Sequence, residues 1–598
     1  MGKRYRLAEV TEELVAVAQG RKPAQIVIQG GKLVNVNTGE IIDHIDVAIT
    51  HGRIALVGDA SHTIGEKTQV IDARGYYVTP GFMDGHIHVE SSMMTVTEYA
   101  KAVIPRGTTS IYMDPHEIAN VLGIEGVRVM IEDGETVPLR VHVTTPSCVP
   151  ATPGFEDTGA HIGPEEIRQS MTWDSVVGLG EMMNFPGVLS GDTNIHQELQ
   201  ATLQANKIIT GHYSMPETGA GLNGYIASGV RCCHESVREE DALAKMRLGM
   251  YAQIREGSAW HDVKETIKSI TEHHIDTRYA TLVSDDTHPN TLLTQGHLDH
   301  VVRRAIEEGV NPITAIQMVT INVAQCFQMD HDLGSISPGR FADILLLSDL
   351  TKVQVEKVLI NGEVVAEKGK MSVSLSTPSY PEFTKKTMHL AAPLTKEDFV
   401  ILAPKGKIGK ITTRVMEIIE AKVGTYARKF DLPIHDGEVK PDFNQDIIKV
   451  AVVERHKATG SIGKGFVKGF HLKEGAIAST VAHDSHNLLI IGTNEEDMAL
   501  AGNTLAEVGG GMVAVKDGKV ISLLPLPIAG LMSEEPVEKL APIVAKMDEA
   551  WKILGSNMVS PFMTMALLSL AVLPELRLTN RGLIDTVNFQ KVDLFIEE

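Results

Sequence analysis

Cysteine and basic residues are scarce in this chain of 598 residues. Its four cysteines, Cys148, Cys232, Cys233 and Cys326, form no CxxC pair, and 55 Lys and Arg against 76 Asp and Glu give a net charge of −21. So few cysteines exclude a disulfide scaffold and indicate a reducing, cytoplasmic location. The acidic balance argues against binding to a nucleic-acid backbone, which requires a basic face.

Long apolar runs are also missing. The longest apolar stretch, near Met558–Leu573, is interrupted by Pro561 and is shorter than the ~20 residues of a membrane span. We interpret it as a buried helix and predict no membrane association. Residues 1–23 lack the apolar run of a signal peptide and are predicted to form an amphipathic helical segment. A hydrophobic content of 43 % is typical of a globular protein, and the length predicts two or three domains.

Two β-rich stretches bracket the middle of the chain. Residues 24–80 are short β-branched runs separated by Gly-Gly, Asn-Thr-Gly and His-Gly turns, and a similar run recurs at Gly339–Lys370. Such runs predict hairpins. We expect residues 24–80 and 330–380 to form one β-sandwich domain from both flanks.

The middle zone, residues 81–329, alternates strand-like and helix-like segments. Eight strands are predicted: Phe82–His88, Thr109–Met113, Arg140–Thr144, Ser175–Glu181, Lys207–His212, Val230–His234, Met250–Arg255 and Tyr279–Asp285. Eight β/α units in this length predict an α/β fold, a (β/α)8 TIM-like barrel. A doubly wound open sheet is the alternative, but no GxGxxG follows the first strand. Residues 381–598 carry further strands and two helical regions, which predict an α+β C-terminal domain.

The segment "GFMDGHIHVESS" places two histidines on one strand face, since residues i and i+2 project together. His86 and His88 stand near the end of the first predicted strand, and function in such barrels sits at that end. The other predicted strands end in or just before chemically similar residues: Asp114, His116, Glu181, His212, His234, Glu235, Asp285 and Asp286. One such histidine alone is more often a hydrogen-bonded structural residue, and one such carboxylate alone is commonly a helix N-cap. Together they predict a metal site.

The donor set is nitrogen and oxygen without thiolate, which suits Mn²⁺, Fe²⁺ or Zn²⁺. Four of these histidines with two of these carboxylates are already too many ligands for one tetrahedral ion. Such a set suits two ions bridged by a carboxylate. Such ions lower the pKa of bound water, and Asp285 at the last strand is placed to accept its proton.

Two segments carry a family resemblance. "PGFMDGHIHVESS" resembles the opening motif of the amidohydrolase superfamily, and "LGSISPGRFADILLL" resembles the superfamily's exit from the barrel into the flanking sandwich. More narrowly, "YMDPHEIANVLG", "GHYSMPETGAGLNGY", "VSDDTHP", "ERHKATG" and "VGGGMV" are similar, over essentially the full length, to the two-metal adenine deaminases of bacteria.

The resemblance implies a ligand set for two divalent ions, Mn²⁺ or Fe²⁺ with Zn²⁺ as the alternative. Its members are His86, His88, Glu181, His212, His234 and Asp285, with Glu181 bridging. It also implies hydrolytic deamination of adenine to hypoxanthine and ammonia in purine salvage. In that hypothesis a bridging hydroxide attacks C6, Asp285 transfers the proton, and Glu235 contacts the purine ring.

Further residues are assigned by position. We predict substrate contacts for Asp114, His116, Arg255, Ser258 and Asp286. For Asp114 and Glu235 the alternative is a role in supporting the metal ligands from behind. For Arg255 the alternative is a pair with a helix end or a loop carboxylate, and Asp285 is preferred to Asp286 as the ligand because it comes first at the strand end. We predict that His483, Asp484 and His486 form a lid or an extra ion site, with a polar turn as the alternative.

Other functions remain open at this stage. An amidase or N-acetyl sugar deacetylase would use the same metal ligands, so these residues do not discriminate between substrates. A non-catalytic scaffold is disfavoured because all six ligand positions are filled. We expect adenine and water as the small-molecule partners, no nucleic acid, and a homodimer.

Overall fold

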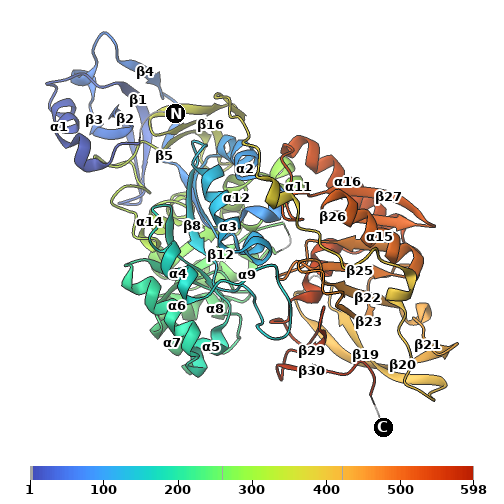
Figure 1. The fold of residues 1–598 in the computed structure, drawn as a ribbon. Coiled ribbons are helices and arrows are strands. Elements are labelled where there is room, and N and C mark those ends of the chain that lie inside the picture. The colour runs from blue at the N-terminus through green and yellow to red at the C-terminus, as the bar shows by residue number, and fades with distance from the viewer. Residues whose placement is uncertain (1–3, 259, 421, 597–598) are drawn as a thin grey trace.

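Three nine-stranded sheets organise the computed structural model, which describes residues 4–258, 260–420 and 422–596. They follow one another across the molecule, with the flanking sheet at one end, a barrel in the middle and the C-terminal domain beside the barrel (Figure 1). Among the described residues, no helix has both the length and the apolar character needed to cross a membrane.

The middle sheet is a parallel barrel whose strands follow sequence order. Its strands are β6 (Phe82–His88), β7 (Thr108–Met113), β8 (Arg140–Thr145), β9 (Val176–Met182), β10 (Ile208–Gly211), β11 (Val230–Cys233), β12 (Tyr251–Arg255), β13 (Ala280–Val283) and β14 (Asp285–Asp286). All eight predicted strands are present, and the eighth is broken at Ser284 into β13 and β14. The short β14 closes the barrel, because it pairs in parallel with β6 and sets Asp286 opposite His88.

Helices connect the barrel strands. They are α2 (Val96–Val103), α3 (His116–Gly134), α4 (Pro164–Ser170), α5 (Phe185–Ser190), α6 (Thr193–Gln204), α7 (Ala220–Ala227), α8 (Glu239–Arg247), α9 (Val263–Thr266), α10 (Lys268–Thr271), α11 (Pro289–Thr294), α12 (Leu298–Glu307), α13 (Pro312–Met318) and α14 (Ile321–Cys326). Short polar side chains fix several helix starts: the Asp192 carboxylate accepts from the first-turn N–H groups of Asn194 and Ile195. The sequence pattern did not predict α3, because most of its residues are buried and Gly123, at φ 64°, kinks it.

The flanking sheet combines strands from both sides of the barrel. Before the barrel come β1 (Ile26–Asn35), β2 (Glu40–Thr50), β3 (Arg53–Gly58), β4 (Gln69–Asp72) and β5 (Tyr77–Pro80); after it come β15 (Ile344–Asp349), β16 (Gln354–Ile360), β17 (Glu363–Glu367) and β18 (Lys370–Met371). The antiparallel pair β5–β15 joins the two flanks where the chain enters and leaves the barrel. Helix α1 (Leu7–Ala18) packs its apolar face on this sheet.

The C-terminal domain holds the third sheet. Its strands are β19 (Gly409–Ile418), β20 (Thr425–His435), β21 (Glu438–Val439), β22 (Ile447–Val453), β23 (Ile462–Lys468), β24 (Ala476–Ser479), β25 (Leu488–Gly492), β26 (Gly511–Lys516) and β27 (Lys519–Pro525). Helices α15 (Glu495–Val508), α16 (Val537–Ile553) and α17 (Pro561–Ala566) and a small sheet of β28 (Leu576–Thr579), β29 (Gly582–Asp585) and β30 (Gln590–Val592) complete it.

The apolar stretch near Met558–Leu573 differs from its prediction as one buried helix. It is mostly buried, but only α17 and a 3-10 turn over Leu567–Ser569 are helical. Ser560 has φ 51°, so helical geometry begins only at Pro561, and the short helix then gives way to a turn. This segment forms a wall of the functional cavity described below.

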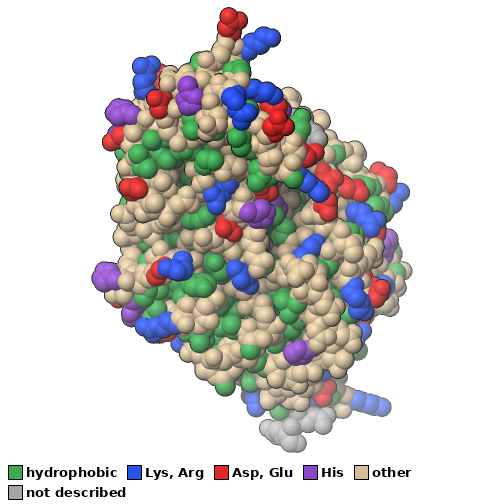
Figure 2. Space-filling view, turned by 90° about the vertical axis from the view of Figure 1, so that its left-hand side faces the viewer, with side chains coloured by type: hydrophobic (Ala, Val, Ile, Leu, Met, Phe, Trp, Pro, Cys, Tyr) green, Lys and Arg blue, Asp and Glu red, His purple; other side chains and the backbone are tan. Residues whose placement is uncertain are grey.

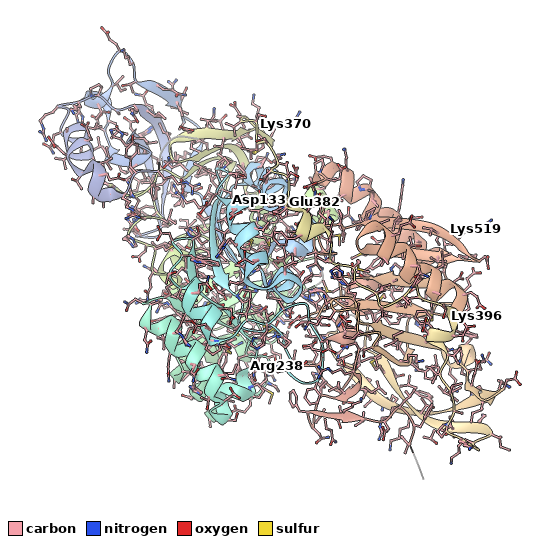
Figure 3. All side chains as sticks on the ribbon, in the orientation of Figure 1. Asp133, Arg238, Lys370, Glu382, Lys396 and Lys519 are labelled. Carbon is pink, nitrogen blue, oxygen red and sulfur yellow. The ribbon has the colours of Figure 1, made fainter. Side chains whose placement is uncertain are left out.

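Polar contacts dock the C-terminal domain on the barrel. The Tyr380 hydroxyl donates to the Asp133 carboxylate of α3 at 2.9 Å, and Figure 3 labels Asp133 and Glu382 at this junction. Arg581 pairs at 2.6 Å with Asp157, in the long loop between β8 and α4. On the face in Figure 2, Lys and Arg side chains are interspersed with Asp and Glu. The C-terminal domain and the segment that leads into it are therefore held against the barrel at two separate points.

Candidate metal centre

All six predicted ligand side chains converge at the carboxyl ends of the barrel strands. His86 and His88 end β6, Glu181 lies in β9, Asp285 begins β14, and His212 and His234 directly follow β10 and β11. Five of them are buried, and His212 is half-buried. The strand order alone explains the convergence, because parallel strands end on one side of a barrel.

Glu181 is the centre of the cluster. Its Oε2 accepts from His212 Nδ1 at 2.6 Å and lies 3.0 Å from His234 Nε2. Its Oε1 lies 3.6 Å from His88 Nε2. The two carboxylate oxygens thus face two different groups of histidines, as a carboxylate shared by two ions requires.

Asp285 faces the histidines of β6. Its Oδ1 lies 3.6 Å from His86 Nε2 and 3.4 Å from His88 Nε2. Asp286 also belongs to a group of potential ligand atoms with His88 and Asp285, and its Oδ1 is buried without a hydrogen-bond partner in the part of the chain that the structure describes. The contacts to both histidines favour Asp285 as the ligand.

The donor atoms fit metal ions. His86 Nε2 is buried and has no hydrogen-bond partner among the described residues, an arrangement that is costly unless something binds there. Imidazole nitrogens and carboxylate oxygens without thiolate are the donors that Mn²⁺, Fe²⁺ and Zn²⁺ accept. Burial alone would raise the pKa of Glu181, but His212 and His234 hold it well below its usual value. An anionic carboxylate among imidazoles is therefore preformed.

Asp114 lies behind this cluster and not on its open side. The Asp114 side chain is fully buried, and its Oδ2 accepts from the backbone N–H of Glu181 at 2.7 Å. Its carbonyl oxygen lies 2.9 Å from His88 Nδ1, so that the Nδ1–H donates there and Nε2 is left free to bind an ion. The predicted substrate contact is thus placed where it orients two ligands.

Arg255 is surrounded by carboxylates. It is 3 % exposed, pairs with Glu235, and donates to Asp285 Oδ2 at 2.9 Å and to Asp262 Oδ2 at 2.7 Å. This is the alternative arrangement, in which the guanidinium pairs with a loop carboxylate. Burial alone would raise the pKa of Glu235, but Arg255 with His212 and His234 lowers it to about 2.

Sequence reasoning assigned no role to Asp84, His297 and Lys245. Asp84, inside the "GFMDGHIH" motif, accepts from Ser284 at the break before β14 and lies 3.1 Å from His297 Nε2. Lys245 of α8 is buried and donates to Tyr213 O at 3.3 Å and to Glu235 O. The position of Asp84 inside the histidine motif could have indicated a role for its carboxylate. Lys245 lies in an ordinary helical pattern, which gives no such indication.

A cavity of about 230 Å³ opens over the cluster. Barrel residues His88, Glu181, Glu235 and Asp285 line one side. The C-terminal domain supplies the opposite side: Val423, His483, Asp484, Met563, Leu567, Leu570, Leu573 and Pro574. The C-terminal domain therefore covers the barrel mouth and completes the cavity.

The remaining predicted residues lie in several places, and not all of them line this cavity. His116, the first residue of α3, has Nδ1 3.0 Å from Glu181 Oε1. Ser258 lines a neighbouring cavity of about 330 Å³, where its Oγ donates to Thr291 Oγ1 at 2.8 Å. His483 lines both cavities, whereas His486 Nδ1 accepts from the backbone N–H of Ala482 at 3.2 Å.

Comparison with known proteins fits this geometry. The model for the amidohydrolase family matches residues 77–365, which span the barrel and its links to the flanking sheet. The family match and the barrel with its strand-end cluster of histidines and carboxylates thus define an amidohydrolase, a hydrolase acting on C–N bonds. The model for the adenine deaminase C-terminal domain matches residues 422–590.

Relatives that match nearly the whole chain are named adenine deaminase. The chain is 62 % identical over 592 residues to adenine deaminase of Clostridium botulinum, covering 99 % of this chain and 98 % of that protein. It is 63 % identical to adenine deaminase of Moorella thermoacetica, with 98 % of each chain covered. It is 48 % identical to adenine deaminase of Mesorhizobium japonicum, covering 98 % of this chain and 97 % of that protein. The chain belongs to the adenine deaminase family.

Proposed function

We propose that this chain hydrolyses adenine to hypoxanthine and ammonia. The observation that carries the proposal is the division of the histidines between the two oxygens of Glu181, directly under the cavity between the two domains. Sequence identity of 62 % and 63 %, over nearly the whole chain, to relatives named adenine deaminase supports adenine as the substrate. At about 230 Å³ the cavity is below the range of drug-sized ligand sites, roughly 300–1,000 Å³, and suits a free base better than a nucleoside.

The proposed ligands form two groups that share Glu181. His86, His88 and Asp285 hold one divalent ion, and His212 and His234 hold the other. When bound, two such ions would lower the pKa of water towards neutrality and stabilise the negative charge of the attacking oxygen. We propose Mn²⁺ or Fe²⁺, because the donors are imidazole and carboxylate.

The side chains divide the proton transfers in this proposal. A water molecule forms a C–O bond at C6, and its proton passes to the Asp285 carboxylate, which Arg255 holds in place at 2.9 Å. As C6 becomes tetrahedral, its π electron pair moves to N1 of the ring. Asp285 then delivers the proton to the exocyclic nitrogen, and the C–N bond breaks to release ammonia. The electron pair on N1 restores the ring double bond, and the proton left on the oxygen moves to N1 to give hypoxanthine. Glu235, oriented by the same guanidinium, faces the purine ring.

Apolar side chains have a separate role in this site. Met563, Leu567 and Leu570 cover the bound base and exclude bulk water, which strengthens the electrostatic interactions inside the cavity. These three side chains come from the C-terminal domain, so we infer that both domains are needed for turnover.

Cellular location and assembly are also part of the proposal. The four cysteines are buried and unpaired, which fits a reducing cytoplasm. We further propose a homodimer, which light scattering after gel filtration tests directly.

The decisive experiment measures turnover with defined metal loading. Protein expressed with added Mn²⁺ and an iron chelator is assayed for ammonia release and for the absorbance change from adenine to hypoxanthine. We expect turnover that a chelator abolishes and Mn²⁺ restores. Glu181→Gln should be inactive, whereas the matched variant Glu198→Gln, a buried carboxylate of α6, should remain active. Absence of turnover in protein shown to contain the metal would refute the adenine assignment.

A further inference from the structure

A second group of potential ligand atoms joins the two domains beside the Glu181 cluster. His116 starts α3 of the barrel, whereas His483 and Asp484 lie in the loop that follows β24 of the C-terminal domain. All three side chains are buried, with at most 7 % exposure. Glu117, 1 % exposed, adjoins them with Oε1 3.7 Å from His483 Nδ1.

The polar atoms of this group lack partners. His116 Nε2, Asp484 Oδ2 and both carboxylate oxygens of Glu117 are buried with no hydrogen-bond partner among the described residues. A buried polar group without a partner is unfavourable, because it has lost its hydrogen bonds to water, and proteins rarely leave several together. The cluster is therefore built for a bound group that satisfies these atoms at once.

The spacing of the atoms fits a metal ion. His116 Nε2 lies 3.7 Å and His483 Nδ1 lies 3.6 Å from Asp484 Oδ1. These distances are longer than hydrogen bonds, which run from about 2.7 to 3.2 Å. They match ligand atoms around a tetrahedral ion, since bonds of ~2.1 Å place the ligands ~3.4 Å apart.

We propose that His116, His483 and Asp484 bind a further divalent cation, with Glu117 as the fourth ligand. Two imidazoles and carboxylates in tetrahedral spacing are best matched by Zn²⁺. This ion is distinct from the pair held around Glu181, although His116 touches both sites through its two ring nitrogens. It ties the C-terminal domain to the barrel mouth and holds the cavity closed. The proposal does not depend on which substrate the enzyme takes.

The test counts metal ions in the full-length chain. Protein stripped with a chelator is titrated with Zn²⁺ alone, and bound metal is measured by mass spectrometry after gel filtration. We expect the wild type to bind one ion more per chain than His483→Gln or the milder Asp484→Asn. The matched control is His486→Gln, in the same loop, which should keep the wild-type count because its Nδ1 is already bonded to Ala482.

Three outcomes would overturn the proposal. The first is an unchanged count in both His483→Gln and Asp484→Asn when circular dichroism shows a native fold. The second is an equal loss in His486→Gln, which would assign the effect to disturbance of the loop. The third is a raised KM for adenine in His483→Gln with full metal content, which would make the cluster a substrate contact. Zinc-edge anomalous density between His116 and Asp484 would support the proposal directly.

Discussion

Replacing Asp114 by Asn tests whether this residue acts through the metal ligands or touches the substrate. In the structure, Asp114 Oδ2 accepts a 2.7 Å hydrogen bond from the backbone N–H of Glu181, and Oδ1 has no hydrogen-bond partner among the residues described. Asn keeps the size of the side chain and removes its charge. The backbone carbonyl that receives His88 Nδ1–H is unchanged by the substitution.

The magnitude follows from the bond that is weakened. A hydrogen bond to a charged group contributes about 1.5–3 kcal/mol, and a neutral acceptor recovers about half of that or less. Loss of a residue that orients a metal ligand typically costs about 10- to 100-fold in metal affinity, equivalent to about 1.4–2.7 kcal/mol. We therefore expect Asp114→Asn to weaken binding of the more loosely held ion by about tenfold or somewhat more.

Competition with a chelator measures the metal affinity, and adenine kinetics at saturating Mn²⁺ measure KM and kcat. We expect weaker metal binding with an unchanged KM for adenine. The matched control is Asp133→Asn, also a buried carboxylate in the barrel, which bonds Thr97 and Tyr380 and should leave metal affinity unchanged. Unchanged metal affinity with a KM raised tenfold or more would refute this reasoning and restore Asp114 as a substrate contact.

Three further predictions address proton transfer, charge pairing and burial. Asp285→Asn should lower kcat by about 10²–10⁴ with a native circular dichroism spectrum, and near-full activity would contradict its role. Arg255→Met should destabilise the protein by about 3–5 kcal/mol in a urea titration, because it leaves buried carboxylates without their cation. The control is Arg278→Met, which breaks an exposed pair with Asp276 and should cost less than ~1 kcal/mol in the same assay. Burial, with a smaller contribution from the negative charge of Asp192, raises the pKa of Glu198 from 4.5 to about 8. Ionisation in the unfolded chain then destabilises the wild type as pH rises from 4.5 towards 8, by roughly 3 kcal/mol at pH 7. The melting temperature of Glu198→Gln relative to wild type should therefore increase between pH 5 and 8, and a constant difference would contradict the raised pKa.

The local sequence pattern was sufficient to predict the barrel. Each barrel strand has a short apolar run or an alternating apolar and polar pattern, which differs from the pattern of the neighbouring helices. The eight predicted strands therefore appear in order in the structure. The buried helix α3 shows the limit, because a helix with few exposed residues lacks the polar face on which periodicity depends. Met558–Leu573 shows a second limit, since burial of an apolar run does not determine whether its backbone is helical.

By itself, the sequence determined which side chains meet at the barrel mouth, because parallel strands end at one edge and residues i and i+2 share a face. Only the tertiary structure decided what stands around them. It placed Asp114 behind the ligands, paired Arg255 with Glu235 and Asp285, and brought His483 and Asp484 across from another domain. These contacts join residues far apart in the chain, and their distances depend on how the domains pack. No local periodicity encodes that packing.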